Sequence, residues 1–250
     1  MEICRCDAIV LAVSDYREAD RLVTLFTLEH GKVKGLARGA KRSIRRFGGA
    51  LEPFARLSVQ LAMTGGLVRL DSADVTTLHH RIREDLLKIG YAGYACEATD
   101  LLLPEGLPNI RLHRLLGAWL ERLDSSPAEP SDRRFFEINL LNILGYRPHL
   151  EGCARCGADP GAEPSGGFAG EAGDILCGRC GRGGRQVSVE TLHLLARCLR
   201  SGRFGSVSFP PKELEEAGSI LEPAVVSRVS RPLKSLAFLR ETWGDPGKDT

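Results

Sequence analysis

The feature that most constrains how this chain folds is a pair of matched cysteine knuckles in its C-terminal half. The knuckles read Cys153-Ala-Arg-Cys156-Gly157 and Cys177-Gly-Arg-Cys180-Gly181, with twenty residues between Cys156 and Cys177. Two thiolates with two residues between them can bind one tetrahedral Zn²⁺, and a second such pair completes the four-ligand shell. The pattern therefore predicts a structural Cys4 zinc site, because four thiolates leave no open position for catalysis.

The residues beside these cysteines favour the same interpretation. A glycine follows each pair, and glycine permits the left-handed turn that aims backbone N–H groups at the sulfurs. Arg155 and Arg179 lie inside the pairs. There they either offset the negative charge of a zinc ion with four thiolates or contact DNA. The alternatives for the cysteines themselves are two disulfides or four unrelated buried thiols.

The composition is that of an ordinary globular protein. Hydrophobic residues make up 43% and charged residues 26% of the 250 residues. No apolar run reaches about 18 residues, so we expect no membrane span. Residues 1–7 lack the basic and apolar regions of a secretory signal. We therefore predict a cytoplasmic protein with reduced thiols, in which four of the eight cysteines are packing residues: Cys4, Cys6, Cys96 and Cys198.

Residues 1–78 have the pattern of a small β-barrel. Runs rich in β-forming residues predict five short strands, at residues 7–13, 21–27, 32–37, 54–61 and 67–70. A Gly65-Gly66 turn joins the last two. The OB-fold is the commonest closed barrel with five strands. We therefore assign residues 1–78 to an OB-fold domain.

From residue 79 onward the apolar residues recur at helical spacing. Helices are predicted at residues 79–103, 110–123, 133–144, 189–199 and 212–239. Ser131-Asp132 is the candidate N-cap of the third helix. The predicted fold class is a multidomain α+β protein, in which a five-stranded OB-fold barrel precedes a mainly α-helical domain with an inserted Cys4 zinc module. The expected boundaries are 79–152 and 181–243 for the helical domain, 153–180 for the zinc module and 244–250 for a frayed tail.

A basic segment is the strongest functional signal in the N-terminal half. Seven basic residues and no acidic one lie between Lys32 and Arg46, although the net charge of the chain is only +2. Lysine and arginine neutralise phosphates and release counterions, which supplies most sequence-independent affinity for nucleic acid. Phe47 is suited to stacking on a base, whereas the alternative interpretation is a solvated loop. The predicted DNA-binding residues are Lys34, Arg38, Lys41, Arg42, Arg45 and Arg46.

A second basic cluster lies near the C-terminus, on the last predicted helix. It contains Arg228, Arg231, Lys234 and Arg240. Such a cluster is usually the solvated face of an amphipathic helix. Alternatively, it extends the phosphate contact or attracts an acidic peptide. The apolar residues that would accompany such a peptide are Leu233, Leu236 and Leu239.

The motifs of common enzymes are missing from the sequence. It contains no Walker A sequence, no Gly-x-Ser-x-Gly and no dinucleotide-binding glycine pattern. The vicinal pair His79-His80 lacks a Glu-x-x-His context, which disfavours a catalytic metal. Two rival functions stay open. One is a metal-dependent nuclease that uses Glu18, Asp20 and Glu29, and the other is a zinc-stabilised interaction scaffold with an incidental basic loop.

Taken together, these segments resemble the bacterial RecO family of recombination mediators and DNA repair proteins. In the N-terminal half the resemblance rests on Asp7-Ala-Ile-Val-Leu, Tyr16-Arg-Glu-Ala-Asp-Arg-Leu-Val-Thr-Leu-Phe-Thr27, His30-Gly-Lys, Gly35-Leu-Ala-Arg-Gly-Ala-Lys-Arg42 and Arg46-Phe-Gly-Gly-Ala-Leu-Glu-Pro-Phe54. Further on it rests on Phe135-Phe-Glu-Ile-Asn-Leu-Leu-Asn-Ile-Leu-Gly-Tyr-Arg-Pro148 and on the residues from Arg231 to Leu239. The resemblance covers nearly the whole chain, and the order of the segments makes it specific.

The resemblance implies a non-enzymatic protein that binds single- and double-stranded DNA and anneals complementary strands. It implies work with RecR, contact with the acidic C-terminal tail of single-stranded-DNA-binding protein, and help in loading RecA recombinase on coated strands. It also implies a location in the cytoplasm, at the nucleoid. For the structure it implies an N-terminal OB-fold and zinc knuckles carried by the helical part.

Overall fold

The computed structural model describes residues 2–63, 68–159, 167–170, 172–181 and 184–243. The predicted Gly65-Gly66 turn, most of the glycine- and proline-rich interior of the zinc segment and the tail 244–250 lie outside the described residues. The chain forms two compact units, residues 1–126 and 127–250, and each is described here by itself.

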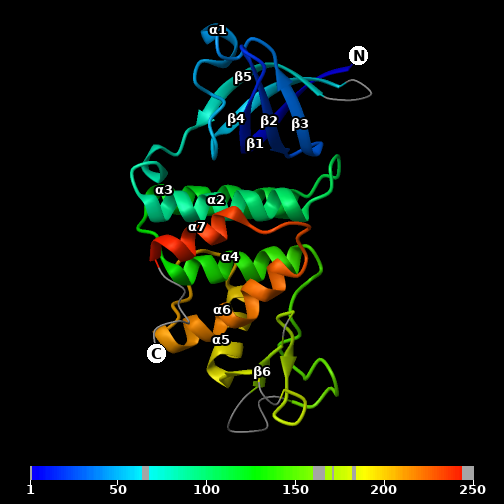
Figure 1. Ribbon diagram of the computed structural model, residues 1–250, viewed down its shortest axis with the longest axis vertical. Helices are drawn as coiled ribbons and strands as arrows, with labels where there is room; N and C mark the ends of the chain where they lie inside the picture. Colours follow the sequence, from blue (N-terminus) through cyan, green and yellow to red (C-terminus); the bar gives the residue numbers. More distant parts are fainter. Residues whose placement is uncertain (1, 64–67, 160–166, 171, 182–183, 244–250) are drawn as a thin grey trace. The chain divides into compact units, whose positions relative to one another are not determined.

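A closed five-stranded barrel forms the first part of the N-terminal unit (Figure 1). The strands are β1 (Glu2–Tyr16), β2 (Asp20–Thr27), β3 (Gly31–Ala37), β4 (Arg56–Met63) and β5 (Val68–Thr77). They close in the order β1-β2-β3-β5-β4, and only β3 and β5 pair in parallel. This arrangement confirms the predicted OB-fold barrel.

Strand β1 is longer than predicted because it belongs to both sides of the barrel. Its first half pairs with β4, its second half pairs with β2, and the register shifts between Val10 and Ala12. The inward side chains fill the barrel, so Val23, Leu25 and Leu57 are fully buried. Closure leaves no free sheet edge, which a five-stranded ribbon of this size would otherwise expose.

Two helices pack in the same unit as the barrel, α2 (Leu86–Leu102) and α3 (Ile110–Ser125). The ring of His113 on α3 meets Phe26 of β2 edge to face, with 5.3 Å between ring centroids. The Nζ atom of the buried Lys32 forms an ion pair with Asp100 Oδ1 at 3.2 Å. The barrel ends with β5 at Thr77, and the compact unit that contains it extends to Ser126.

The helix predicted from residue 79 is interrupted, which corrects that expectation. A short 3-10 helix, η1 (His80–Ile82), comes first, and α2 begins only after Asp85. The Asp85 carboxylate accepts hydrogen bonds from the N–H groups of Leu87 and Lys88, as an N-cap does. His79 is buried in a left-handed conformation with its Nδ1 2.9 Å from Phe54 O, so it has a structural role.

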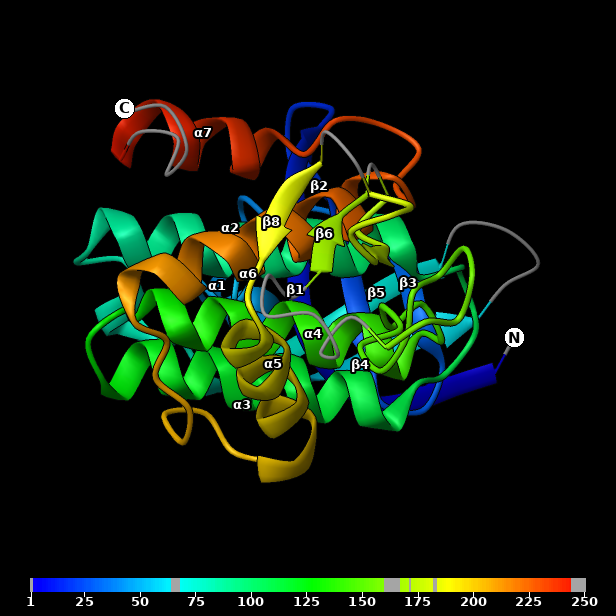
Figure 2. The same cartoon turned by 90° about the horizontal axis from the view of Figure 1, so that it is seen from below.

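The second unit is a helical bundle with a small sheet (Figure 2). Its helices are α4 (Pro130–Ile143), α5 (Val189–Ser201), α6 (Pro211–Val226) and α7 (Lys234–Trp243). The sheet has the strand order β7-β6-β8, from β6 (Gly167–Ala169), β7 (Ile175–Leu176) and β8 (Arg185–Val187). Helices α4, α5 and α6 pack on one another, so their apolar faces form the core of this unit.

Two helix predictions in this unit were wrong. Helix α4 begins at Pro130 after Glu129, because proline favours the first helical position. Ser131 and Asp132 therefore lie inside the helix and accept hydrogen bonds from the N–H groups of Phe209 and Gly205. The helix predicted at 212–239 is two helices, α6 and α7, separated by residues 227–233.

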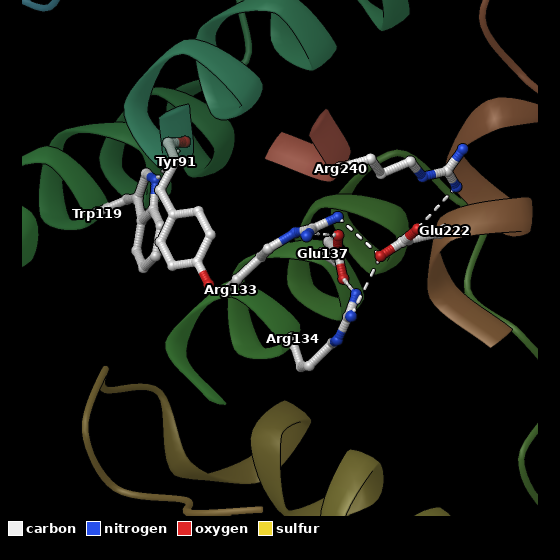
Figure 3. A network of polar contacts seen from close by, with 7 residues as sticks. All are labelled: Tyr91, Trp119, Arg133, Arg134, Glu137, Glu222 and Arg240. Carbon is white, nitrogen blue, oxygen red and sulfur yellow. Dashed lines mark hydrogen bonds and ion pairs between the residues drawn. The ribbon is translucent and has the colours of Figure 1, made fainter. Parts of the chain in front are cut away.

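A buried ionic network joins α4, α6 and α7 within this unit (Figure 3). The Glu137 carboxylate is 0% exposed and accepts from Arg133 Nε at 3.0 Å and from Arg134 Nη1 at 2.7 Å. Both arginines also bind Glu222, which in turn accepts from Arg240. Burial alone would raise the pKa of Glu222, but the charges of the arginines lower it overall. The network therefore stabilises the fold above the ordinary carboxylate pKa and weakens as the pH falls.

We expect the substitution Glu137→Gln to destabilise the C-terminal unit by about 3–5 kcal/mol, because it leaves Glu222 as the one carboxylate paired with two buried guanidinium groups. Chemical denaturation measures this change. The matched control is Asp74→Asn, which removes one partner of an exposed ion pair with Arg5 and costs less than about 1 kcal/mol. Equal small effects of both substitutions would contradict a stabilising role for the network.

Candidate nucleic-acid interface and metal centre

The four knuckle cysteines come together in the C-terminal unit, as the sequence predicts. Their sulfur atoms all lie within 4.8 Å of one another, and Cys156 Sγ is 3.7 Å from Cys177 Sγ. Each knuckle closes by the same backbone hydrogen bond. Gly157 N donates to Cys153 O, and Gly181 N donates to Cys177 O, both at 2.8 Å. These four sulfurs are a donor set that fits one tetrahedral Zn²⁺.

The glycines after the knuckles have different roles. Gly157 has a φ of +74°, which confirms the predicted left-handed turn at the first knuckle. The prediction was wrong at Gly181, whose φ is not positive. There glycine is needed for space, because a Cβ atom would lie 2.6 Å from Cβ of Phe168 on β6. The second glycine therefore lets the knuckle approach the small sheet closely.

Backbone N–H groups and neighbouring thiols set the proton affinity of the cluster. A hydrogen bond from the backbone of Cys177, the largest of several effects, lowers the pKa of the Cys153 thiol to about 6. The bond to the Cys156 side chain raises the pKa of Cys180 to about 12. Thiols must lose their protons to bind a metal, so the N–H groups around the first knuckle prepare it for a cation.

The arginines inside the knuckles face the cysteine cluster. Arg155 Nη1 donates to Cys180 O at 3.2 Å, across to the other knuckle. A hydrogen bond with the Cys156 sulfur raises the pKa of Arg179. These contacts favour the interpretation that both side chains offset the charge of the thiolates.

The basic segment begins on β3, which carries Lys32 and Lys34, and continues as the loop between β3 and β4 in the N-terminal unit. It contains a short helix, α1 (Ile44–Phe47), which the sequence did not predict. Two bonds tie the start of the loop to the β1–β2 connection, from Gly39 N to Asp20 Oδ1 and from Lys41 N to Ala19 O. The loop is therefore held in place on the barrel.

The ion pairs divide the six predicted DNA-binding residues into groups. Lys34 Nζ binds Glu105 at 2.8 Å, next to the α2–α3 connection. Lys41 and Arg42 each bind one acidic residue of the β1–β2 hairpin, Asp15 at 2.8 Å and Glu18 at 2.6 Å respectively. The remaining three are exposed arginines: Arg38, Arg45 and Arg46.

Arg46 contacts two other residues of the same loop. Its Nη2 donates to Arg38 O at 2.6 Å, and its guanidinium lies over the Phe47 ring at 5.0 Å. The side chains of Arg38 and Arg45 have no ion-pair partner among the residues that the structure describes. These two arginines are therefore the cations most available to a phosphate.

The prediction that Phe47 stacks on a base was wrong. Phe47 is 2% exposed and belongs to the barrel core, where it anchors the basic loop. A different aromatic residue is exposed nearby in the fold, Tyr16 at the end of β1, at 40%. The guanidinium of Arg17 lies over its ring at 5.3 Å. Nothing in the local sequence distinguishes Tyr16, because its exposure depends on where the β1–β2 hairpin ends.

The second basic cluster is not on one helix, contrary to the prediction. Arg228 follows α6, Arg231 lies between helices, and Lys234 begins α7. Arg228 donates to Ala224 O at 2.7 Å and lies over the Tyr146 ring at 5.1 Å. The three leucines expected to accompany a bound peptide are buried instead: Leu233, Leu236 and Leu239.

Within the described part of the chain, no helix is both long enough and apolar enough to cross a bilayer.

Both halves of the chain match models of known protein families. The family described as "Recombination protein O N terminal" matches residues 1–79, and "Recombination protein O C terminal" matches residues 83–237. The "DNA repair protein RecO" of Geobacter sulfurreducens is 58% identical over 241 residues, which cover 96% of this chain and 99% of the relative. The protein of that name from Myxococcus xanthus is 39% identical over 242 residues, covering 96% and 98%.

We expect the double substitution Cys177→Ser/Cys180→Ser to lower the zinc content by one ion per chain, because two of the four thiolates are lost. Elemental analysis of the purified protein measures this content. Hydrogen exchange should become faster at the knuckles and remain slow in the barrel. The control Cys96→Ala removes a buried thiol outside the cluster and should retain the metal. An unchanged zinc content in the double variant would contradict the assignment.

Proposed function

Because this chain belongs to the RecO family, whose relatives are named DNA repair proteins, we propose that it binds DNA in recombinational repair and anneals complementary strands without enzymatic chemistry. The observation that carries the proposal is an exposed basic surface on the OB-fold barrel. This surface consists of Arg17 from the β1–β2 hairpin and of the loop residues Arg38, Lys41, Arg42, Arg45 and Arg46.

The ion pairs of Lys41 and Arg42 are compatible with DNA binding. Both pairs are exposed, and exposed pairs are worth only about 0–1 kcal/mol. A phosphate can therefore replace either carboxylate at small cost, and the release of counterions from DNA supplies the gain. The acidic partners also keep the net charge of the surface moderate, which favours weak and reversible contacts. Lys34 lies on β3, outside the loop, and its exposed pair with Glu105 is exchangeable in the same way.

Annealing requires this kind of surface. Two DNA strands repel each other until cations neutralise their phosphates, and their bases must remain free to pair. Arginines that contact only the backbone meet both needs, and they give binding that tolerates any sequence. Exposed Tyr16 beside Arg17 adds a stacking surface for an unpaired base.

The proposed partners follow from the family. We propose that the protein works with RecR, contacts the acidic C-terminal tail of single-stranded-DNA-binding protein, and helps RecA recombinase to assemble on coated strands in the cytoplasm, at the nucleoid. Exposed Arg231 and Lys234 of the C-terminal unit are suited to an acidic tail by charge. Zinc in the knuckles would serve this unit by folding its small sheet, with no chemical step.

The nuclease alternative is weaker because two of its three carboxylates already have partners in the fold. Glu18 binds Arg42, and Asp20 accepts the N–H of Gly39. Within the described residues, the side chains close enough together to share a metal are cysteines and one histidine, with no carboxylate among them. The arrangement therefore favours binding over hydrolysis.

We expect the double substitution Arg42→Glu/Arg45→Glu to weaken binding to all DNA sequences alike, because phosphate contacts carry no sequence information. The slope of log K against log salt should flatten by about 2, about 1 for each lost contact. Fluorescence anisotropy with two unrelated oligonucleotides at several salt concentrations measures both effects. The matched control is Arg111→Glu/Arg114→Glu on α3, which changes the net charge equally and should retain most of the affinity. Equal losses in both variants would contradict a localised surface, and loss for one sequence only would contradict backbone binding.

We expect Tyr16→Ala to weaken binding of single-stranded DNA by about 1–3 kcal/mol while duplex binding changes little, because only unpaired bases can stack on the ring. Tyr16→Phe keeps the ring and should bind like the original protein. Parallel titrations with a single strand and with its duplex separate the two cases. If Tyr16→Ala bound both forms unchanged, Tyr16 would have no stacking role.

A further inference from the structure

A second group of metal-binding side chains lies in the N-terminal unit, far along the chain from the knuckles. Cys4 and Cys6 lie two residues apart on β1, so their side chains share one face of the strand. His30 comes from the turn between β2 and β3. One ligand atom from each of these three residues lies within 4.8 Å of the other two. Three donors from two separate parts of the barrel thus converge on one point.

The distance between the two sulfurs fits a shared metal ion. Cys6 Sγ is 3.6 Å from Cys4 Sγ, close to the 3.7 Å between Cys156 and Cys177 in the knuckles. Two thiolates on one tetrahedral Zn²⁺ are separated by about 3.8 Å, given a Zn–S distance of about 2.3 Å. The sulfur pair therefore has the spacing of two corners of a zinc tetrahedron.

Hydrogen bonds hold the histidine turn in position. Thr27 Oγ1 donates to Gly31 O at 2.9 Å and accepts from His30 N at 3.0 Å. Leu28 N donates to Asp7 O at 2.9 Å, which ties the turn to β1 beside the cysteines. Gly31 admits the backbone of Leu107 against it, where a Cβ atom would lie 2.2 Å from the carbonyl oxygen. The histidine is therefore presented by a fixed backbone.

Packing alone accounts less well for this arrangement. Cys6 is 2% exposed and belongs to the barrel core, which agrees with the interpretation of both cysteines as packing residues. An apolar side chain would fill that position equally well, however, and packing does not require an imidazole beside two thiols. The sulfur contacts, from Cys4 to Leu61 O at 3.7 Å and from Cys6 to Cys4, are weak hydrogen bonds.

We propose that Cys4, Cys6 and His30 bind a second Zn²⁺ ion, which fastens the β2–β3 turn to the start of β1. Two thiolates and an imidazole are ligands that zinc prefers. Three protein ligands leave the fourth position to a water molecule or to a donor from a partner. Cys4 and His30 are partly exposed, which gives solvent access to the site. None of its three residues belongs to the knuckles or to the proposed DNA contacts.

Zinc analysis of the full-length protein, purified without chelators and dialysed against metal-free buffer, tests the proposal. We expect two zinc ions per chain in the original protein and one in Cys4→Ser/Cys6→Ser. The control Cys96→Ala, which removes a buried thiol outside both clusters, should keep two. One ion in the original protein, or two in the double variant, would overturn the proposal.

The variant Cys4→Ser/Cys6→Ser could also lose zinc because it misfolds. A second variant and a spectroscopic measurement separate this case from loss of the site. His30→Gln leaves both thiols and the barrel core intact, and it should lose the second ion to a competing chelator at lower concentration than the original protein does. After substitution with Co²⁺, the original protein should show a stronger thiolate-to-cobalt absorption band than Cys4→Ser/Cys6→Ser. Identical cobalt spectra, or an unchanged response of His30→Gln to the chelator, would show that the three residues do not form one site.

Discussion

Closure of the barrel through β1 is the constraint on which the proposed DNA-binding surface depends. One strand pairs with both β2 and β4. Its C-terminal end fixes the hairpin that carries Tyr16, and its middle pairs with Arg56, where the loop that follows β3 ends. Buried Phe47 then anchors that loop from below, and Asp20 holds its start. A flexible basic loop would lose much conformational entropy on binding DNA. This loop is already held by Asp20 and by buried Phe47, so it would lose less.

Charge is used differently in the two units. In the barrel unit the acidic partners of Lys41 and Arg42 are exposed, which keeps the pairs weak and exchangeable. In the helical unit Arg133 and Arg134 are buried with Glu137 and Glu222, which makes their pairs costly to break. The same residue types therefore form exchangeable pairs at one place, where we propose that DNA binds, and fix helix packing at the other. Zinc in the knuckles would add a third kind of constraint, because the small sheet has little apolar core of its own.

Local patterns predicted much of this structure, and long-range contacts explain most of what they missed. The knuckles could be predicted from spacing, and the five strands from runs rich in β-forming residues. The burial of Phe47 depends on how the loop returns to the barrel, and the space needed at Gly181 depends on Phe168 of another strand. The ionic network joins residues more than eighty positions apart, so no sequence window contains it. Cys4 and Cys6 were interpreted as packing residues because their neighbour His30 is supplied by a different hairpin.

The most direct test of the account is the annealing of two complementary oligonucleotides by the purified protein, without ATP and without added Mg²⁺ or Mn²⁺, at two salt concentrations. The account predicts faster annealing than in buffer alone, a marked loss of that acceleration at the higher salt concentration, and strands of unchanged length. No acceleration by a folded protein would contradict it and favour an interaction scaffold. Shortened strands on adding Mg²⁺ or Mn²⁺ would contradict the non-enzymatic function.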